Sequence, residues 1–135
     1  MKIKAIATLL CAVVALPAAA DEPPRVDTTG WFENPAKLDQ VEGEDIYNAI
    51  CAACHMPDGK GAVGAGMYPA LAGNDNLLGA DYPIHVILNG LRAMPALDGQ
   101  LDHEQVAAVV NYIRAGFGND WSENPATAET VAASR

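Results

Sequence analysis

A run of five residues, Cys51-Ala52-Ala53-Cys54-His55, holds the side chains best suited to chemistry. On a helix the two cysteines would lie at positions i and i+3, so both sulfurs would emerge on one face. This C-x-x-C-H pattern is the signature of covalent c-type haem attachment, in which both cysteines form thioethers to the porphyrin and the histidine binds the iron. We therefore predict that Cys51 and Cys54 anchor one haem c and that His55 is an axial ligand of its iron.

Three other uses of this motif fit the sequence less well. A thioredoxin-like redox pair would require a strand-helix-strand setting, and no alternating strand pattern is present. A structural zinc site needs four ligands, whereas the other histidines, His85 and His103, are isolated in the sequence. A disulfide between Cys51 and Cys54 would leave the neighbouring histidine without a role.

The second axial ligand of a haem iron separates electron transfer from ligand binding or catalysis. Met94 lies 39 residues after His55 in a loop between two predicted helices, where Pro95 favours an extended backbone at Met94. Met56 adjoins His55 and cannot reach the opposite face of the iron, and Met67 lies in a glycine-rich segment. We predict that Met94 is the second iron ligand.

Short amphipathic helices are predicted around these residues. The clearest one begins after Asp102, which forms a capping box with Gln105, and ends at Gly116. The segment 56–80 holds six of the twelve glycines, which predicts mostly loop. Further helices are predicted at about 44–54, at 75–78 with Asn74 as cap, from an Asp81 cap to Gly90, and at 128–133 with Thr127 as cap.

The first twenty residues have the pattern of a secretory signal peptide. Lys2 and Lys4 precede an apolar run that ends in small residues, which predicts cleavage after Ala20. Cys11 would then be removed, leaving only the two cysteines of the C-x-x-C-H motif. We therefore expect export to an oxidising space, the periplasm, as a protein without a transmembrane segment once the signal is cleaved.

The remaining chain divides into three predicted parts. Residues 21–41 form an extended lead-in, residues 42–118 a single compact domain, and residues 119–135 a C-terminal turn and short helix. The full chain has 17 acidic and 8 basic side chains among 135 residues, a formal net charge of −9. Because binding to a phosphate backbone requires Lys and Arg, this excess of acid argues against a nucleic-acid partner.

The order of these motifs resembles that of class I c-type cytochromes, and within them the single-haem domains of cytochrome subunits that serve periplasmic dehydrogenases. The resemblance covers most of residues 43–118. It is carried by C-x-x-C-H, Gly59 to Gly66, Tyr68-Pro69-Ala70-Leu71-Ala72-Gly73-Asn74, Arg92-Ala93-Met94-Pro95, Val109-Val110-Asn111-Tyr112-Ile113-Arg114, the Gly118-Asn119 turn and Thr127-Ala128-Glu129.

The resemblance implies an all-α cytochrome c fold, with short helices and glycine-rich loops around one covalent haem. It implies that the carbonyl of Pro69 accepts the Nδ1 proton of His55, and that Gly43 and Tyr47 pack against Tyr112 where the first and last helices cross. Two further expectations concern single segments. Arg92 is a candidate partner of a haem propionate. The glycines of 59–64, which fit G-x-G-x-x-G only by chance, would let the backbone pass a haem edge.

The resemblance also implies a function. We expect an electron carrier, not an enzyme, that takes single electrons from a periplasmic dehydrogenase towards a terminal oxidase or another acceptor. It would act as a free protein or as a subunit of a dehydrogenase complex. The alternative is a haem-based ligand binder or a small peroxidase-like enzyme, in which the sixth iron position is open or labile.

Overall fold

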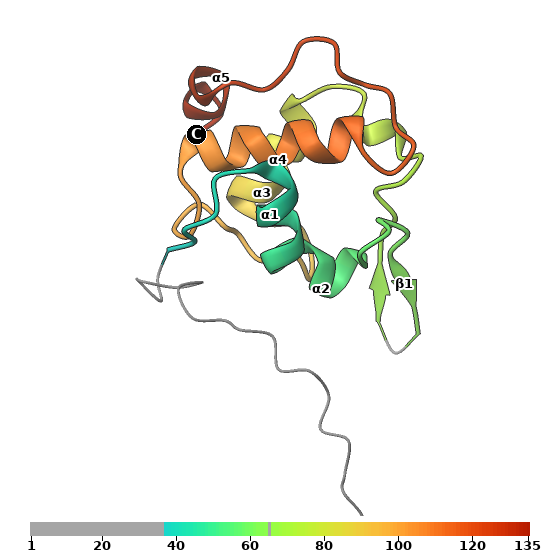
Figure 1. The fold of residues 1–135 in the computed structure, drawn as a ribbon. Coiled ribbons are helices and arrows are strands. Elements are labelled where there is room, and N and C mark those ends of the chain that lie inside the picture. The colour runs from blue at the N-terminus through green and yellow to red at the C-terminus, as the bar shows by residue number, and fades with distance from the viewer. Residues whose placement is uncertain (1–36, 65) are drawn as a thin grey trace, which may run out of the picture.

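The computed structural model describes residues 37–64 and 66–135, so the predicted signal peptide and most of the lead-in lie outside the described residues. Helices dominate the described chain (Figure 1). In chain order the elements are α1 (Gly43–Ile46), the π-helix η1 (Tyr47–Cys51), α2 (Ala52–His55), β1 (Ala62–Val63), β2 (Met67–Tyr68), the 3-10 helix η2 (Asp75–Leu77), α3 (Asp81–Asn89), α4 (His103–Ala115) and α5 (Ala128–Ala133).

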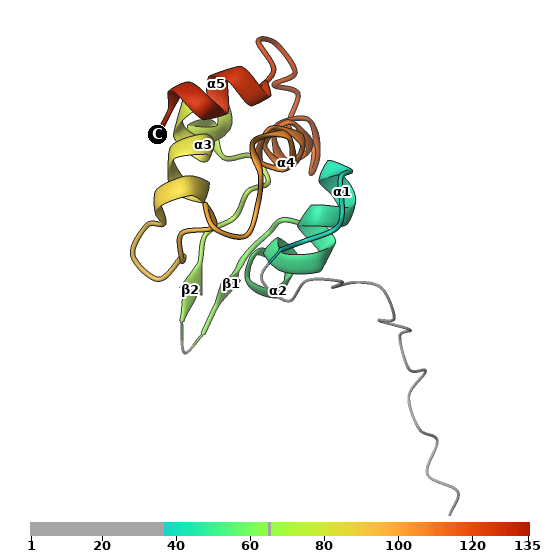
Figure 2. The same ribbon diagram turned by 90° about the vertical axis from the view of Figure 1, so that its left-hand side faces the viewer.

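Helix α4 is the centre of the molecule. Seen nearly end-on, it lies between α1 on one side and α3 with α5 on the other (Figure 2). The predicted capping box is confirmed, because Gln105 N donates to Asp102 Oδ1 at 2.8 Å and Asp102 N donates to Gln105 Oε1 at 2.9 Å. Apolar side chains at helical spacing fill the surrounding core, including Val106, Val109, Val110 and Ile113.

The N-terminal helical segment crosses α4 at very short range. A Cβ atom at Gly43 would overlap the carbonyl oxygen of Ala108 and lie 2.8 Å from Tyr112 Cβ, so only glycine fits there. The ring of Tyr47 then packs 5.6 Å from the Tyr112 ring and 4.9 Å from the Phe117 ring, measured between centroids. The predicted crossing at these residues is confirmed.

The first predicted helix differs from expectation in its winding. Residues 43–55 are helical throughout, but Tyr47–Cys51 form a π-helix between two α-helical ends, not one α-helix over 44–54. A π-turn contains about one residue more than an α-turn, and such turns are frequent at functional sites. The apolar pattern over so short a segment cannot distinguish the two periods, which explains the difference.

A small antiparallel hairpin interrupts the segment predicted as loop. Strands β1 and β2 pair Ala62 with Tyr68 and Val63 with Met67. The hairpin projects away from the helices in both views (Figures 1 and 2). Its apolar side chains are largely open to solvent, with Val63 89% and Met67 71% exposed. Strands of two residues are too short to give an alternating pattern in the sequence.

The short helix η2 and the helix α3 begin and end close to the predicted residues. Asn74 caps η2 as expected, because its Oδ1 accepts from Asn76 N at 3.1 Å. Asp81 was predicted to cap α3, and this was wrong by one residue: Ala80 is the cap, and Asp81 is the first helical residue. An acidic side chain is favourable at both positions because of the helix dipole, so the sequence does not separate them.

Arg114 attaches the C-terminal segment to the rest of the fold. Its side chain is buried, and it donates hydrogen bonds of 2.9–3.2 Å to four backbone carbonyls. Two of these carbonyls, Leu77 and Leu78, lie at the end of η2, and the other two, Glu123 and Asn124, lie in the turn before α5. Residues 119–135 are therefore part of the packed structure.

Among the helices described, none is long and apolar enough to cross a membrane.

Replacing Gly43 with Ala should destabilise the fold, because its Cβ would push α1 away from α4. We expect the free energy of unfolding of the haem-loaded protein to fall by about 2 kcal/mol, as for other overpacked contacts. Urea unfolding measures the change. Gly79→Ala is the control, since a Cβ at Gly79 has no atom within 4 Å. Equal effects of the two substitutions would contradict the tight crossing.

Candidate functional site

The residues of the C-x-x-C-H motif lie at the end of the first helical segment. Cys51 is the last residue of η1, and Cys54 and His55 belong to α2. Both thiols are free and half-buried. The cysteines are therefore about one helical turn apart on a segment whose start is fixed by the crossing with α4.

The imidazole of His55 is held by a backbone carbonyl. His55 Nδ1 lies 2.9 Å from the oxygen of Pro69, which directly follows β2. A carbonyl can only accept, so Nδ1 carries the proton and Nε2 keeps a lone pair for a metal ion. This is the contact that the resemblance implies, and it gives the ring both a tautomer and an orientation.

Two glycines bring the motif and the Pro69 segment together. Gly61 N donates to His55 O at 3.0 Å, and Gly59 O accepts from Leu71 N at 2.7 Å. A Cβ at Gly61, where φ is +65°, would overlap the Tyr68 carbonyl oxygen. We expected these glycines to let the backbone pass a haem edge. In the structure, Gly59 lies against the Phe117 ring and Gly61 against the backbone carbonyls of Tyr68 and Pro69.

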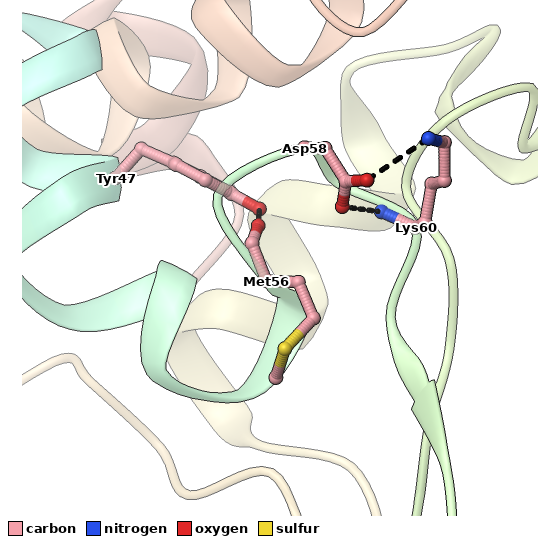
Figure 3. Close-up of polar contacts among 4 residues, drawn as sticks. All are labelled: Tyr47, Met56, Asp58 and Lys60. Carbon is pink, nitrogen blue, oxygen red and sulfur yellow. Dashed lines mark hydrogen bonds and ion pairs between the residues drawn. The ribbon is translucent and has the colours of Figure 1, made fainter.

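Tyr47 fixes the turn that follows His55, which the sequence did not reveal. Its hydroxyl donates to Met56 O at 2.7 Å (Figure 3), and Met56 has a left-handed φ of 64°. Burial raises the pKa of Tyr47 to about 12, with smaller contributions from the negative charges that Cys51, Tyr112 and Asp58 would carry. The only signal in the sequence was a tyrosine at helical spacing before Cys51.

The same turn is closed by Asp58 and Lys60. Lys60 Nζ lies 3.0 Å from Asp58 Oδ2, and Lys60 N donates to Asp58 Oδ1 at 3.2 Å (Figure 3). These hydrogen bonds lower the pKa of Asp58 below its usual value. Both side chains are exposed, so we expect the pair to contribute little to stability.

Met94 comes from a separate loop after α3. It is half-buried against the apolar core, whereas Met67 projects from the hairpin into solvent. Leu91 and Met94 exchange two backbone hydrogen bonds of 3.0 Å, which fixes the Met94 backbone. Arg92 is exposed in the turn between them. Met94 is therefore the methionine whose surroundings suit a buried ligand, and the pairing of Arg92 with a haem propionate stays a prediction.

Left-handed backbone at non-glycine residues occurs beside both candidate iron ligands. Met56 follows His55 directly, and Arg92, with φ 55°, precedes Met94 by two residues. Such a conformation costs roughly 1–2 kcal/mol per residue and persists only where surrounding contacts impose it. The hydrogen bonds from Tyr47 and between Leu91 and Met94 supply those contacts.

The alternative uses of the motif do not match this geometry. Burial, and to a lesser extent Cys54, raises the pKa of the Cys51 thiol to about 12, whereas a thiol-disulfide catalyst needs a lowered thiol pKa. Cys51 and Cys54 form no disulfide. Within the residues that the structure describes, no three side chains among His, Cys, Asp and Glu gather to hold a metal ion. A zinc site or a redox-active pair is therefore not supported.

The donor set fits a covalently attached haem. It offers two free thiols about one turn apart, an imidazole with Nε2 available, and a thioether in a fixed loop beside the core. In such a site Cys51 and Cys54 would hold the porphyrin, and His55 and Met94 would hold the iron.

Replacing Tyr47 with Phe removes the donor to Met56 O, and we expect a loss of about 1 kcal/mol in the free energy of unfolding at pH 8. The raised pKa adds a pH dependence. The folded protein keeps the Tyr47 proton to higher pH than the unfolded chain, so its stabilisation is full below pH 10.0 and is lost as the pH rises towards about 12.

Urea unfolding between pH 8 and 12 measures this effect. The decline in stability should be shallower in Tyr47→Phe than in the unmodified protein. Tyr82→Phe, at a tyrosine that is 46% exposed, is the control and should leave the decline unchanged. Parallel curves for the Tyr47 variant and the unmodified protein would contradict the role of burial.

Several known proteins are similar to this chain in sequence. Residues 39–113, more than half of the chain, match the family model described as cytochrome c oxidase, cbb3-type, subunit III. Cytochrome c6 from Synechococcus sp. is 30% identical over 99 residues, which cover 72% of this chain and 88% of that protein. The cytochrome c subunit of the quinone alcohol dehydrogenase from Gluconacetobacter polyoxogenes is 38% identical over 93 residues, covering 58% of this chain.

The match spans 19% of that dehydrogenase subunit, so this chain corresponds to about a fifth of such relatives. Among solved structures, cytochrome cL from Methylophaga aminisulfidivorans superposes with a TM-score of 0.48 at 18% identity, over 85% of this chain and 83% of that one. From the family model and the match to cytochrome c6, the chain belongs to the cytochrome c family, with one covalently attached haem c.

Proposed function

We propose that this protein carries single electrons in the periplasm, on a haem whose iron is ligated by His55 and Met94. Cys51 and Cys54 form the thioethers. The observation that carries the proposal is the 2.9 Å contact between His55 Nδ1 and Pro69 O, because it leaves Nε2 of the residue next to Cys54 free to bind a metal ion. When bound, haem supplies a one-electron Fe(III)/Fe(II) couple.

Pro69 and Met94 have different roles in this proposal. The Pro69 carbonyl keeps the His55 proton on Nδ1 and raises the basicity of the ligand. Met94, on its fixed loop, would be the second residue that holds the iron, and it would so exclude other molecules from it. A site with both axial positions filled favours electron transfer over catalysis, which is why we propose a carrier and not an enzyme.

The proposed partners are redox proteins: a periplasmic dehydrogenase as donor, and a terminal oxidase or another protein as acceptor. Support comes from relatives named as cytochrome subunits of an alcohol dehydrogenase (quinone) and of a fructose dehydrogenase.

The charge pattern of the sequence bears on the surface that a partner would meet. Although the chain has 17 acidic residues, the segments 59–74 and 82–97, which carry Pro69 and Met94, contain none. A partner that approaches along these segments meets mostly apolar side chains.

Replacing Met94 with Ala tests the proposed ligand. Ferric haem ligated by a methionine sulfur has a weak charge-transfer absorption band at long wavelength. This band should be present in the unmodified protein and lost in Met94→Ala. Met67→Ala is the matched control and should keep the band, because Met67 is 71% exposed on the hairpin.

Loss of the band in Met67→Ala would assign the ligand to Met67 instead. Carbon monoxide provides a second measurement, since it binds ferrous haem only where a coordination position is open. The unmodified protein should bind it slowly or not at all, and Met94→Ala should bind it readily. Ready binding by the unmodified protein would favour the alternative function of a ligand binder or peroxidase-like enzyme.

Export is tested by expressing the full chain in a bacterium that attaches haem c. The holoprotein should appear in the periplasmic fraction, with an N-terminus at Asp21 by mass spectrometry. Its mass should include one haem bound through Cys51 and Cys54. A haem-loaded protein that retains residues 1–20 would contradict the proposed cleavage.

A further inference from the structure

We propose that Asn119 is a positioning residue for His55, acting through the loop that carries the Pro69 carbonyl. This inference rests on the proposed role of His55 as an iron ligand. Asn119 lies four residues after the end of α4 and 64 residues from His55. Its side-chain hydrogen bonds are to Leu71, Gly73 and Ile113, and not to His55 or Pro69. Its effect would therefore be transmitted by the backbone between Pro69 and Gly73.

Asn119 is buried, with 7% of its surface exposed, and both its amide nitrogen and its amide oxygen form hydrogen bonds. Its Nδ2 donates to Leu71 O at 3.0 Å and to Ile113 O at 2.8 Å, and its Oδ1 accepts from Gly73 N at 2.8 Å. One bond anchors the amide to α4, and the other two hold the backbone on both sides of Ala72. The amide thus fixes the Pro69 loop, residues 69–73, to the central helix.

The opposite side of the Pro69 loop is bonded to the segment that follows the motif. Gly59 O accepts from Leu71 N at 2.7 Å and from Ala72 N at 3.0 Å. Leu71 is therefore held by its N–H from one side and by its carbonyl from the other. Pro69 has no N–H of its own, so the position of its carbonyl depends on these neighbouring contacts.

The Pro69 carbonyl in turn sets the electron density on the imidazole. A short hydrogen bond from Nδ1 makes the histidine a stronger donor to a metal ion, which favours Fe(III) over Fe(II) and lowers the reduction potential. If the Asn119 amide is removed, Leu71 and Gly73 lose their partners and the Pro69 loop can move away from His55. The hydrogen bond should weaken, and the reduction potential should rise.

The test compares two asparagine variants of the holoprotein. Asn119→Ala removes the contacts to the Pro69 loop. Asn111→Ala is the matched control, because Asn111 also makes reciprocal side-chain hydrogen bonds, donating to Ala126 O at 2.9 Å and accepting from Ala126 N at 2.8 Å. Asn111 joins α4 to the segment before α5. Its two hydrogen bonds are to Ala126 and not to the Pro69 loop. Both variants should lose stability to a similar extent.

Two measurements separate positioning from mere stabilisation: the reduction potential by redox titration, and the solvent exchange rate of the His55 Nδ1 proton by NMR of the ferrous protein. We expect Asn119→Ala to raise the potential and speed the exchange, while Asn111→Ala leaves both at the values of the unmodified protein. Unchanged values in Asn119→Ala would overturn the inference, as would equal shifts in both variants.

Two further outcomes are distinguishable. If Asn119→Ala gives no folded holoprotein, Asn119→Ser is compared with Asn111→Ser by the same measurements and judged by the same criteria. If the unmodified ferrous protein shows no His55 ring resonances shifted by the haem, His55 is not the ligand. In that case the proposed function fails, whatever the two variants do.

Discussion

The short-range crossing of α1 and α4 determines where the C-x-x-C-H motif can lie. At Gly43 the two backbones approach so closely that no side chain fits between them. Tyr47, one turn further on, then packs against Tyr112 and Phe117. The helical segment is thus fixed at its start and middle, and its end carries Cys54 and His55. The position of the motif is therefore a consequence of packing between two helices that are distant in sequence.

Hydrogen bonds between backbone groups and side chains hold the loops around the motif in place. Tyr47 holds the Met56 carbonyl, the Gly59 carbonyl binds Leu71 and Ala72, and Pro69 holds the imidazole of His55. None of these bonds is part of a regular helix or sheet. A small domain with a limited apolar core can still hold a ligand in one orientation in this way, because the backbone carbonyls of Met56, Gly59 and Pro69 each have a defined partner.

The residues alone predict the parts of the structure that are set by neighbours in the chain, whereas the packing of Gly43 and Tyr47 on Tyr112 was expected only from the family resemblance. The C-x-x-C-H spacing, the Asp102–Gln105 capping box and the cap at Asn74 involve residues two to four apart. The π-turn at Tyr47–Cys51 and the hairpin were missed, because segments of two to five residues carry no readable period. The hydrogen bonds of Tyr47, Asn119 and Arg114 depend on tertiary contacts, and the sequence shows only that a tyrosine precedes Cys51 at helical spacing.

The hydrogen bonds of Arg114 have a consequence for behaviour in acid. This buried guanidinium is bound by four backbone carbonyls, from η2 and from the turn before α5. An ion pair at the same place would weaken once its carboxylate took up a proton, whereas a peptide carbonyl takes up no proton over that range. The hydrogen bonds by which Arg114 joins α4, η2 and the C-terminal segment therefore involve no carboxylate, although the chain around them is rich in carboxylates.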